Sequence, residues 1–571
     1  MTGAGGRRRP SWKGLCTLAG LGVLVAACQA TPSPSSSPGE SVPAFVSTSY
    51  PLGGPADCAY GGEIAQIKAV DQLTVEFSLC YRDPAFLSKV ALANNAIQDG
   101  AWLTKYGPTG QLAAQANGTG PYRVTKSSLS TAPVDLISLG RFAGYWGKPA
   151  KAAVVTIGSN ADPAARMQAL HRGSVDGIDD PSASDLATIA ANSTLQLVPR
   201  ELLNTTYIGM TNDFAPFDNV KVRQALARGL DRQRMILNAF PSGSSLARFF
   251  TPCSIEFGCV GQPWYERDLE AARSLLVNPG FPGPLATHIY YRDEAGCGLA
   301  DPALVAHELQ AQLQDDLKIT ADLRPLPSLT FNEKLSAGLL DGLYVLDWCA
   351  EYPDVTNFLD RQFDNPATRQ FGTIDPSIAD ALAAAGKAAD ANARKAAYTA
   401  ANDAIREVVP LIPIAHGGSA TAWKADVVGA VASPLDAESF AAMDPGGRGS
   451  LAWMQTRSPA SLYCTDPADG DSVRLCQNVF EQLYTFKPGT AVVTPGLATS
   501  CDPNEQLTVW TCHLREGVTF HDGAALDSND VLLSYAAQWD AKHVIHVGSG
   551  GRFDGWSREF GPFLNGTPPA P

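Results

Sequence analysis

A chain of 571 residues exceeds what one simple hydrophobic core supports, so two or three domains are expected. Its hydrophobic content of 45% is typical of a globular protein. The formal net charge of −14 argues against nucleic acid and against an anionic membrane surface as the partner, because both would repel an acidic protein.

The first 28 residues indicate export. Basic residues near the start precede an apolar run over residues 15–27, which is too short for a membrane-spanning helix of about 20 residues. The run ends in Val-Ala-Ala-Cys, which resembles a bacterial lipobox in which Cys28 would carry the lipid; an ordinary signal cut after Ala27 is the alternative. Residues 29–57, rich in proline and serine at their start, are expected to form a solvated tether.

The first half of the chain alternates strands and helices. From Leu73 to Leu79 apolar and polar residues alternate, as in a half-buried strand. Asp162, Pro163 and Gly173 are typical helix boundary residues. The predicted elements are two strands over 63–80, a helix over 87–97, strands over 134–141 and 151–158, and a helix over 162–176.

The second half continues this alternation, which predicts the α/β class with sheets covered on both faces. Residues 302–317 have apolar side chains at helical spacing, whereas 343–348 read as a buried strand. The further elements are a strand over 204–212, one or two alanine-rich helices over 378–407, an extended segment over 410–414, a strand over 450–456, a helix over 472–486, and strands followed by a helix over 508–539.

Several motifs resemble the large bacterial solute-binding proteins of peptide and nickel ABC importers, family 5 of the extracellular solute-binding proteins. The longest match is 204–236, NTTYIGMTNDFAPFDNVKVRQALARGLDRQRMI. The others are GTGPY at 118–122, GYWGKP at 144–149, FEQL at 480–483, PGLA at 495–498, and the stretch 514–535. The resemblance implies a two-lobed periplasmic-binding-protein-like fold (type II, cluster C) with an extra peripheral domain, and a ligand enclosed between the lobes.

The order of these motifs predicts a circular permutation. Residues 450–566 resemble the start of such a protein, and the segment that should follow them stands at the front of the chain. A truncated second copy is the alternative, but residues 29–57 are too few to supply the missing start of a first copy. The glycine-rich stretch 443–449 would join the former end to the former start.

The permutation assigns each lobe to separate parts of the chain. The hinge crossings are expected near 203–204 and 428–429. The predicted domains are the signal peptide (1–28), the tether (29–57), peripheral domain II (58–117 and 484–566), lobe I (118–203 and 430–483) and lobe III (204–429).

Ten cysteines remain beyond Cys16 and Cys28, and an even number in an exported chain predicts disulfides. No CxxC pair is present and the spacings are loose for zinc, so no metal site is expected. The sequence does not fix the connectivity. Pairing near neighbours gives Cys58–Cys80, Cys253–Cys259, Cys464–Cys476 and Cys501–Cys512, which leaves Cys297 with Cys349.

The segment 347–358, DWCAEYPDVTNF, resembles the part of oligopeptide- and dipeptide-binding proteins in which an acidic residue receives the peptide's α-ammonium group. The resemblance implies this role for Glu351, with Asp354 as a second candidate. Trp348 would form an aromatic wall or face a cation. A cation buried by lobe closure needs an anionic partner, which favours the assignment. The alternative is an acidic loop with Trp348 in the core.

Further candidate contacts have more than one interpretation. Tyr207 is interpreted either as a ligand contact or as a core residue. Glu351 replaces the usual aspartate, and the basic residue that precedes the tryptophan in some relatives is missing here. Arg292 or Arg361 could replace that counter-charge for a ligand carboxylate. The loop 466–472 matches a segment that lines the cleft in the family.

Other polar residues are interpreted as structural. His543 and His546 are expected to be solvent-exposed and not metal ligands, and His521 is expected to shape a turn. The acidic cluster Asp176, Asp179 and Asp180 does not have EF-hand spacing, so we expect a solvated loop. No catalytic constellation and no cofactor motif is found in the sequence, which argues against a hydrolase.

These observations together predict a lipid-anchored solute-binding protein of an ABC importer, outside the cytoplasm on the outer face of the cytoplasmic membrane. It would capture a peptide or a similar small cationic ligand by lobe closure and deliver it, as a monomer, to an ABC permease. The alternative is a surface sensor or interaction lipoprotein of the same fold without a transport role.

Overall fold

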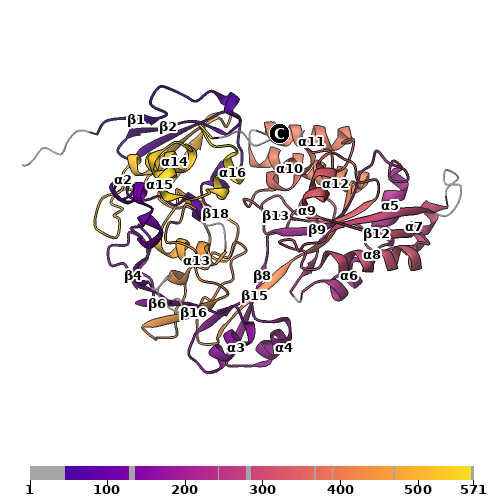
Figure 1. Cartoon of the computed structure of the whole chain (residues 1–571), viewed down its shortest axis with the longest axis horizontal. Coiled ribbons are helices and arrows are strands. Elements are labelled where there is room, and N and C mark those ends of the chain that lie inside the picture. Colours follow the sequence, from indigo (N-terminus) through magenta and orange to yellow (C-terminus); the bar gives the residue numbers. More distant parts are fainter. Residues whose placement is uncertain are drawn as a thin grey trace, which may run out of the picture. The chain divides into compact units, whose positions relative to one another are not determined.

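Three large sheets organise the chain, which was analysed as a computed structural model (Figure 1). The structure describes residues 45–127, 136–241, 243–277, 285–364, 368–388, 390–466 and 470–566. The signal peptide, Cys28 and most of the tether lie outside these residues. From Val46 onward the chain forms one unit. Among the described residues, no helix has the length and apolar character needed to cross a membrane.

Domain II contains a five-stranded antiparallel sheet built from both ends of the chain. Its strand order is β1 (Thr48–Tyr50), β2 (Ile64–Asp71), β3 (Thr74–Leu79), β20 (Val509–Leu514) and β19 (Ala498–Pro503). Its helices are α1 (Phe86–Lys89), α2 (Gly100–Tyr106), α14 (Ser528–Trp539), α15 (Val544–Ser549) and α16 (Asp554–Phe560). Figure 1 shows the yellow α14 beside the indigo β1 and β2, and α14 packs on both strands. The rings of Phe77 and Tyr535 meet there, with centroids 5.1 Å apart.

Lobe I contains a seven-stranded mixed sheet with a strand from the tail near its centre. Its order is β4 (Tyr122–Ser127), β5 (Leu136–Arg141), β6 (Val154–Ser159), β16 (Ser450–Gln455), β7 (Gly177–Asp179), β15 (Gly418–Lys424) and β8 (Leu195–Glu201). Its helices are α3 (Pro163–His171), α4 (Ala183–Ala191) and α13 (Gly470–Val479). Strand β16 runs parallel to both β6 and β7. The tail therefore supplies an interior strand of this lobe.

Lobe III contains a six-stranded sheet around the fully buried β9 (Asn204–Met210). Its order is β10 (Ser245–Leu246), β14 (Leu411–His416), β9, β13 (Leu343–Cys349), β11 (Ala286–Arg292) and β12 (Thr320–Leu326). Its helices are α5 (Val220–Gly229), α6 (Arg232–Ala239), α7 (Leu269–Leu276), α8 (Pro302–Asp316), α9 (Ser328–Ser336), α10 (Leu359–Phe363), α11 (Pro376–Lys387) and α12 (Ala391–Val408). A short ribbon of β17 (Tyr484–Phe486) and β18 (Val493–Pro495) stands apart.

Two adjacent connections join lobe I to lobe III. The first leads from β8 to β9, as predicted, but the second passes through Gly417, between β14 and β15. The predicted crossing at 428–429 is wrong, because β15 pairs with β7 and β8 of lobe I. The Asn204 side chain accepts a hydrogen bond from the Gly417 N–H at 2.6 Å, which ties the two connections together.

Three predicted boundaries need correction. The helix predicted over 87–97 ends at Lys89, because the Lys89 carbonyl accepts hydrogen bonds from Leu92 N–H and from the Asn95 side chain. The helix predicted over 472–486 ends at Val479, whose carbonyl accepts from Gly120 N–H. Strand β1 lies within the predicted tether and pairs with β2, so domain II begins before residue 58.

All ten cysteines from Cys58 onward form disulfides, in the pairing suggested by their spacing. The bridges are Cys58–Cys80, Cys253–Cys259, Cys297–Cys349, Cys464–Cys476 and Cys501–Cys512. Each closes a loop of fewer than about 60 residues, a size at which a disulfide typically adds about 2–4 kcal/mol to stability.

A buried ion network crosses lobe I and consists of Asp179, Arg200, Glu438 and Arg474. Arg200 Nη2 lies 2.9 Å from Asp179 Oδ1 and 2.6 Å from Glu438 Oε1. Arg474 Nη2 lies 2.8 Å from Asp179 Oδ2 and its Nε contacts Glu438 Oε2. All four side chains are buried, so each charge depends on its partners.

The solvated loop predicted at Asp176, Asp179 and Asp180 is therefore wrong for the first two residues. Asp176 is also buried, and it accepts from Lys424 Nζ at 2.9 Å and from Ala452 N–H at 2.8 Å. Only Asp180 remains largely exposed. The partners of these carboxylates come from distant parts of the chain, so their burial has no local signal in the sequence.

We expect a chain that ends at Gly446 to be unfolded. It lacks β16 from the interior of the lobe I sheet and β20 from the domain II sheet, which leaves β3, β6 and β7 with open edges. Circular dichroism and limited proteolysis of the truncated chain measure this. A cooperative thermal transition in that chain would contradict the assignment of the tail to both domains.

Asp179→Ala should lower the free energy of unfolding by about 3–5 kcal/mol, because it leaves two buried guanidinium groups without one of their carboxylates. Urea unfolding followed by tryptophan fluorescence measures the change. Asp218→Ala, at an exposed acidic residue, is the control and should change stability by less than about 0.5 kcal/mol.

Candidate functional site

A cavity of about 450 Å³ lies where residues of lobe I, lobe III and domain II meet. This volume is within the range of small-molecule binding sites. Lobe III contributes Trp348 and Glu351, domain II contributes Asn94 and Glu559, and lobe I contributes Val473 and Gln477 from α13. Charged and apolar side chains therefore line the same space.

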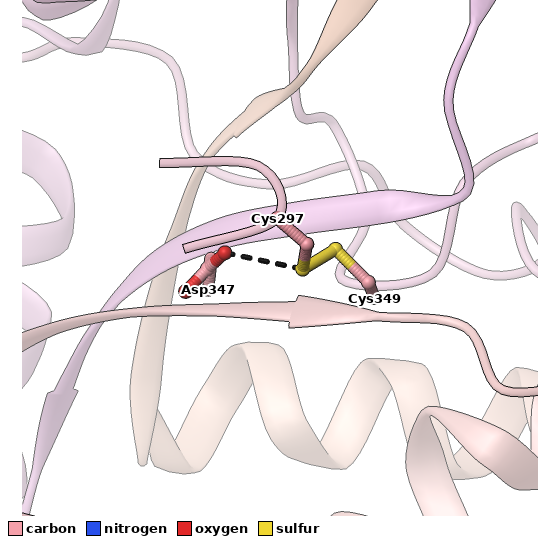
Figure 2. Close-up of side chains that lie close together, drawn as sticks. All are labelled: Cys297, Asp347 and Cys349. Carbon is pink, nitrogen blue, oxygen red and sulfur yellow. Dashed lines mark hydrogen bonds between the residues drawn. A yellow bond between two sulfur atoms is a disulfide. The ribbon is translucent and has the colours of Figure 1, made fainter. Parts of the chain in front are cut away.

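The end of β13 forms the lobe III wall, and Asp347 anchors it. Its carboxylate pairs with Arg292 and accepts from Gly298 N–H at 2.8 Å. Figure 2 shows the Cys297–Cys349 disulfide beside this carboxylate, which lies 3.2 Å from Cys297 Sγ. The disulfide thus ties the loop after β11 to the last residue of β13.

The three side chains of Figure 2 place their potential ligand atoms within 4.8 Å of one another. A metal ion at such a site would need cysteine thiolates, however. The two sulfur atoms are bonded to each other, so Cys297 and Cys349 form a disulfide in the cavity wall and do not provide thiolate ligands for a metal ion.

Glu351 lies in the cavity wall and has a loose ionic partner. Its side chain is 16% exposed, and its nearest cation, Arg361 Nη2, lies 3.7 Å away. Its N–H donates to Asn357 Oδ1 at 3.0 Å, which fixes the backbone of the loop after β13. The loop therefore fixes the position of Glu351, and within the described part of the chain its carboxylate has no guanidinium group closer than 3.7 Å.

Trp348 also lines the cavity, at the position that the sequence predicts for an aromatic wall. Its ring lies 5.9 Å from the Arg361 guanidinium. Its Nε1 is buried and has no hydrogen-bond partner among the described residues.

Two predicted ligand contacts lie elsewhere. Asp354 does not line the cavity; it is buried, accepts from Thr356 N–H and pairs with Arg394 Nη2 at 2.7 Å. Tyr207 is completely buried in the lobe III core, where its hydroxyl donates to Gln370 Oε1. Of the two interpretations of Tyr207, the core residue is correct.

The two arginines considered as counter-charges differ in position. Arg292 lines the cavity but is already paired with Asp347. Arg361 lies beside Glu351 on the helix that follows and is not part of the wall. Of the loop 466–472, residues 467–469 lie outside the described residues.

Sequence reasoning missed the domain II wall, which contains Asn94, Arg558 and Glu559. Glu559 is 6% exposed and accepts from Asn94 Nδ2 at 2.9 Å and Asn95 Nδ2 at 2.7 Å. Burial raises the pKa of its carboxyl group to about 8, although these hydrogen bonds act in the opposite direction. No motif marks α16, so its place in the cavity follows only from the fold.

Lys89 joins domain II to the lobe III loop near the cavity. Its buried ammonium group lies 2.6 Å from Glu63 and 3.0 Å from Asp83. It also lies 5.0 Å from the ring centroid of Tyr352, the residue after Glu351. This cation–π contact connects the two walls of the cavity.

The histidines have structural roles. His521 links its turn to the GTGPY segment: Nδ1 accepts from Gly118 N–H at 3.3 Å and Nε2 contacts the Gly120 carbonyl at 3.0 Å. Burial lowers its pKa to about 4. The expected exposure of His543 and His546 is wrong, since both are half-buried: the first caps α15 and the second packs on Phe553.

Gly296→Ala should disturb the cavity wall, because a Cβ at this position collides with both carboxylate oxygens of Asp347. The carboxylate must then leave Arg292 and Gly298, at a cost of about 1–3 kcal/mol. Thermal unfolding measures the loss. Gly386→Ala in α11 is the control, because no atom lies within 4 Å of the added methyl group and the helix favours alanine.

Residues 30–370 and 492–550 match the family described as bacterial extracellular solute-binding proteins, family 5 Middle. Heme-binding protein A of Haemophilus influenzae is 25% identical over 397 residues, which cover 67% of this chain and 70% of that protein. The glutathione-binding protein GsiB of Salmonella choleraesuis is 31% identical over 229 residues, 40% of this chain and 43% of that protein.

Among solved structures, HbpA2 from Haemophilus parasuis is similar with a TM-score of 0.60 and 24% identity, over 64% of this chain and 72% of that one. The similarity confirms the two-lobed periplasmic-binding-protein fold. Together with the family match, which covers more than half of the residues, it leads to one conclusion. The chain belongs to the bacterial extracellular solute-binding proteins of family 5, which are binding proteins of transporters and not enzymes.

Proposed function

We propose that this protein captures peptides, or cationic solutes of similar size, for an ABC importer. The observation that carries the proposal is the Glu351 carboxylate, which lines the cavity beside Trp348 with only a loose ionic partner. A solute ammonium group loses water when it enters the cavity, and a carboxylate compensates this loss. The indole of Trp348 offers a π face for the cation.

Lobe closure about the two connections is the mechanism that we propose for capture. The connections at Asn204 and Gly417 are tied by a hydrogen bond, so they can bend together as one hinge. Glu351 and Tyr352 follow each other on one loop, the first at the solute and the second on Lys89. Closure would thus bury the solute cation, and the Lys89–Tyr352 contact that this structure already contains would hold the two walls together.

We also propose that Cys28 carries a lipid and that the chain is a circular permutation of the family order. The permutation is supported by the position of the tail, which supplies β16 to lobe I and β20 to domain II. The tether then leads into β1 at the edge of the domain II sheet. In this arrangement the lipid would hold the protein by domain II, next to the α16 wall of the cavity.

Glu351→Gln should weaken the binding of the tripeptide Ala-Ala-Ala by about 10- to 100-fold, because a charged hydrogen bond worth about 1.5–3 kcal/mol is lost. Isothermal titration calorimetry measures the affinity. N-acetylated Ala-Ala-Ala, which has no ammonium group, should bind weakly to both proteins and show no difference between them.

Glu333→Gln is the matched control, since Glu333 is an exposed carboxylate on α9 of the same lobe and is not part of the cavity. It should bind the free tripeptide as the unchanged protein does. Equal affinity of Glu351→Gln and the unchanged protein for Ala-Ala-Ala would refute the assignment of Glu351.

A further inference from the structure

We infer that Glu559 is a second anionic anchor in the same cavity, and that the preferred solute carries two separate cationic groups. The inference rests on the proposed function, in which Glu351 receives the first cation. Glu559 belongs to a different wall: it is part of α16 in domain II, whereas Glu351 follows β13 of lobe III. A solute with one cation at each end would bridge the two walls.

The partners of Glu559 are neutral. Its two oxygens accept three hydrogen bonds, from Asn94 Nδ2 at 2.9 and 3.1 Å and from Asn95 Nδ2 at 2.7 Å. These bonds orient the carboxyl group but bring no positive charge to it. No lysine, arginine or histidine forms an ion pair with it among the described residues.

Asp347, the other buried carboxylate of the cavity, differs from Glu559 in having a cationic partner. It is 7% exposed, nearly the same as Glu559 at 6%, yet it has a direct ion pair with Arg292. A buried carboxylate with a guanidinium partner is part of the wall. A buried carboxylate that lines a cavity without such a partner is a site for a cation from outside.

The charged neighbours of Glu559 are engaged elsewhere. Lys89 is held by Glu63 and Asp83, and the exposed Arg558 donates from Nε to the Asp554 carbonyl at 3.2 Å. The remaining titratable neighbour, Tyr535, is neutral because burial raises its pKa well above the usual value. Burial raises the pKa of the Glu559 carboxyl group to about 8 and outweighs the lowering by Lys89 and Arg558, neither of which forms an ion pair with it.

Two cationic groups on a small solute define a chemical class. Within the peptides that we propose as ligands, the class is a short peptide whose free amino terminus binds Glu351 and whose lysine or arginine side chain binds Glu559. The net charge of −14 of the protein favours the approach of such a solute.

The test compares Ala-Lys-Ala and Ala-Ala-Lys with Ala-Gln-Ala and Ala-Ala-Gln by calorimetry. The unchanged protein should bind one lysine peptide at least tenfold more tightly than its glutamine counterpart. Glu559→Gln should remove this preference without changing the affinity for the glutamine peptides. Glu351→Gln should weaken all four peptides and keep the preference, and Glu333→Gln should change nothing.

A second measurement detects the release of a proton from Glu559 when the peptide binds. The Glu559 carboxyl group is mostly protonated at pH 7 because its pKa is about 8, so binding of a cation must release that proton. Titrations in two buffers of different ionisation enthalpy should show release of up to one proton for the preferred lysine peptide. The release should be absent in Glu559→Gln, and affinity should rise with pH up to about 8 only in the unchanged protein.

The outcomes separate the two proposals. If the unchanged protein binds lysine and glutamine peptides equally tightly, the second anchor is refuted while capture of peptides stands. If none of the four peptides nor Ala-Ala-Ala binds, the proposed function fails and the second anchor with it. Because the first comparison uses the unchanged protein, a folding defect of Glu559→Gln cannot decide the result.

Discussion

The buried ion network of lobe I connects three separate parts of the chain: strands β7 and β8, the loop that contains Glu438, and helix α13. Asp179 and Arg200 come from strands of the front half, and Arg474 comes from α13 in the tail. Glu438 ends a loop whose Leu435 and Ala437 line the cavity. The charges are mutually satisfied and inaccessible to water, so none can be withdrawn alone without a large cost. Because the same α13 contributes Val473 and Gln477 to the cavity, the network also fixes that wall.

The carboxylates Glu351 and Glu559 of the cavity differ from those of the ion network in their partners. In the network each carboxylate faces two guanidinium groups. By contrast, among the described residues the nearest arginine to Glu351 lies 3.7 Å away, and Glu559 accepts hydrogen bonds only from asparagine amides. Both arrangements desolvate carboxylates, and the difference lies in what compensates them. A fixed internal cation stabilises the fold, while under the proposed function the missing cation is supplied by the solute. The same residue type thus stabilises lobe I and is the group to which we assign recognition in the cavity.

Helix boundaries and motif positions that depend on nearby residues were predictable from the sequence. Contacts between residues far apart in the sequence were not. The boundaries of α3 follow from Asp162 and Pro163, and the position of Glu351 follows from its motif. The end of α13 was missed because the partner of the Val479 carbonyl lies in the distant GTGPY segment. The burial of Asp179 and the place of Glu559 were missed for the same reason. Each depends on side chains hundreds of residues away, which no local pattern encodes.

The interior position of β16 has a consequence for how the protein matures. Strands β6 and β7 leave the ribosome early, but the strand that fits between them is made only after most of the chain. Until then both present unpaired edges, which are prone to pair with other chains. The lobe I sheet can therefore be completed only after residue 455 has been synthesised, when β16 becomes available to pair with β6 and β7. The order of segments in the chain thus sets the timing of folding as well as the architecture.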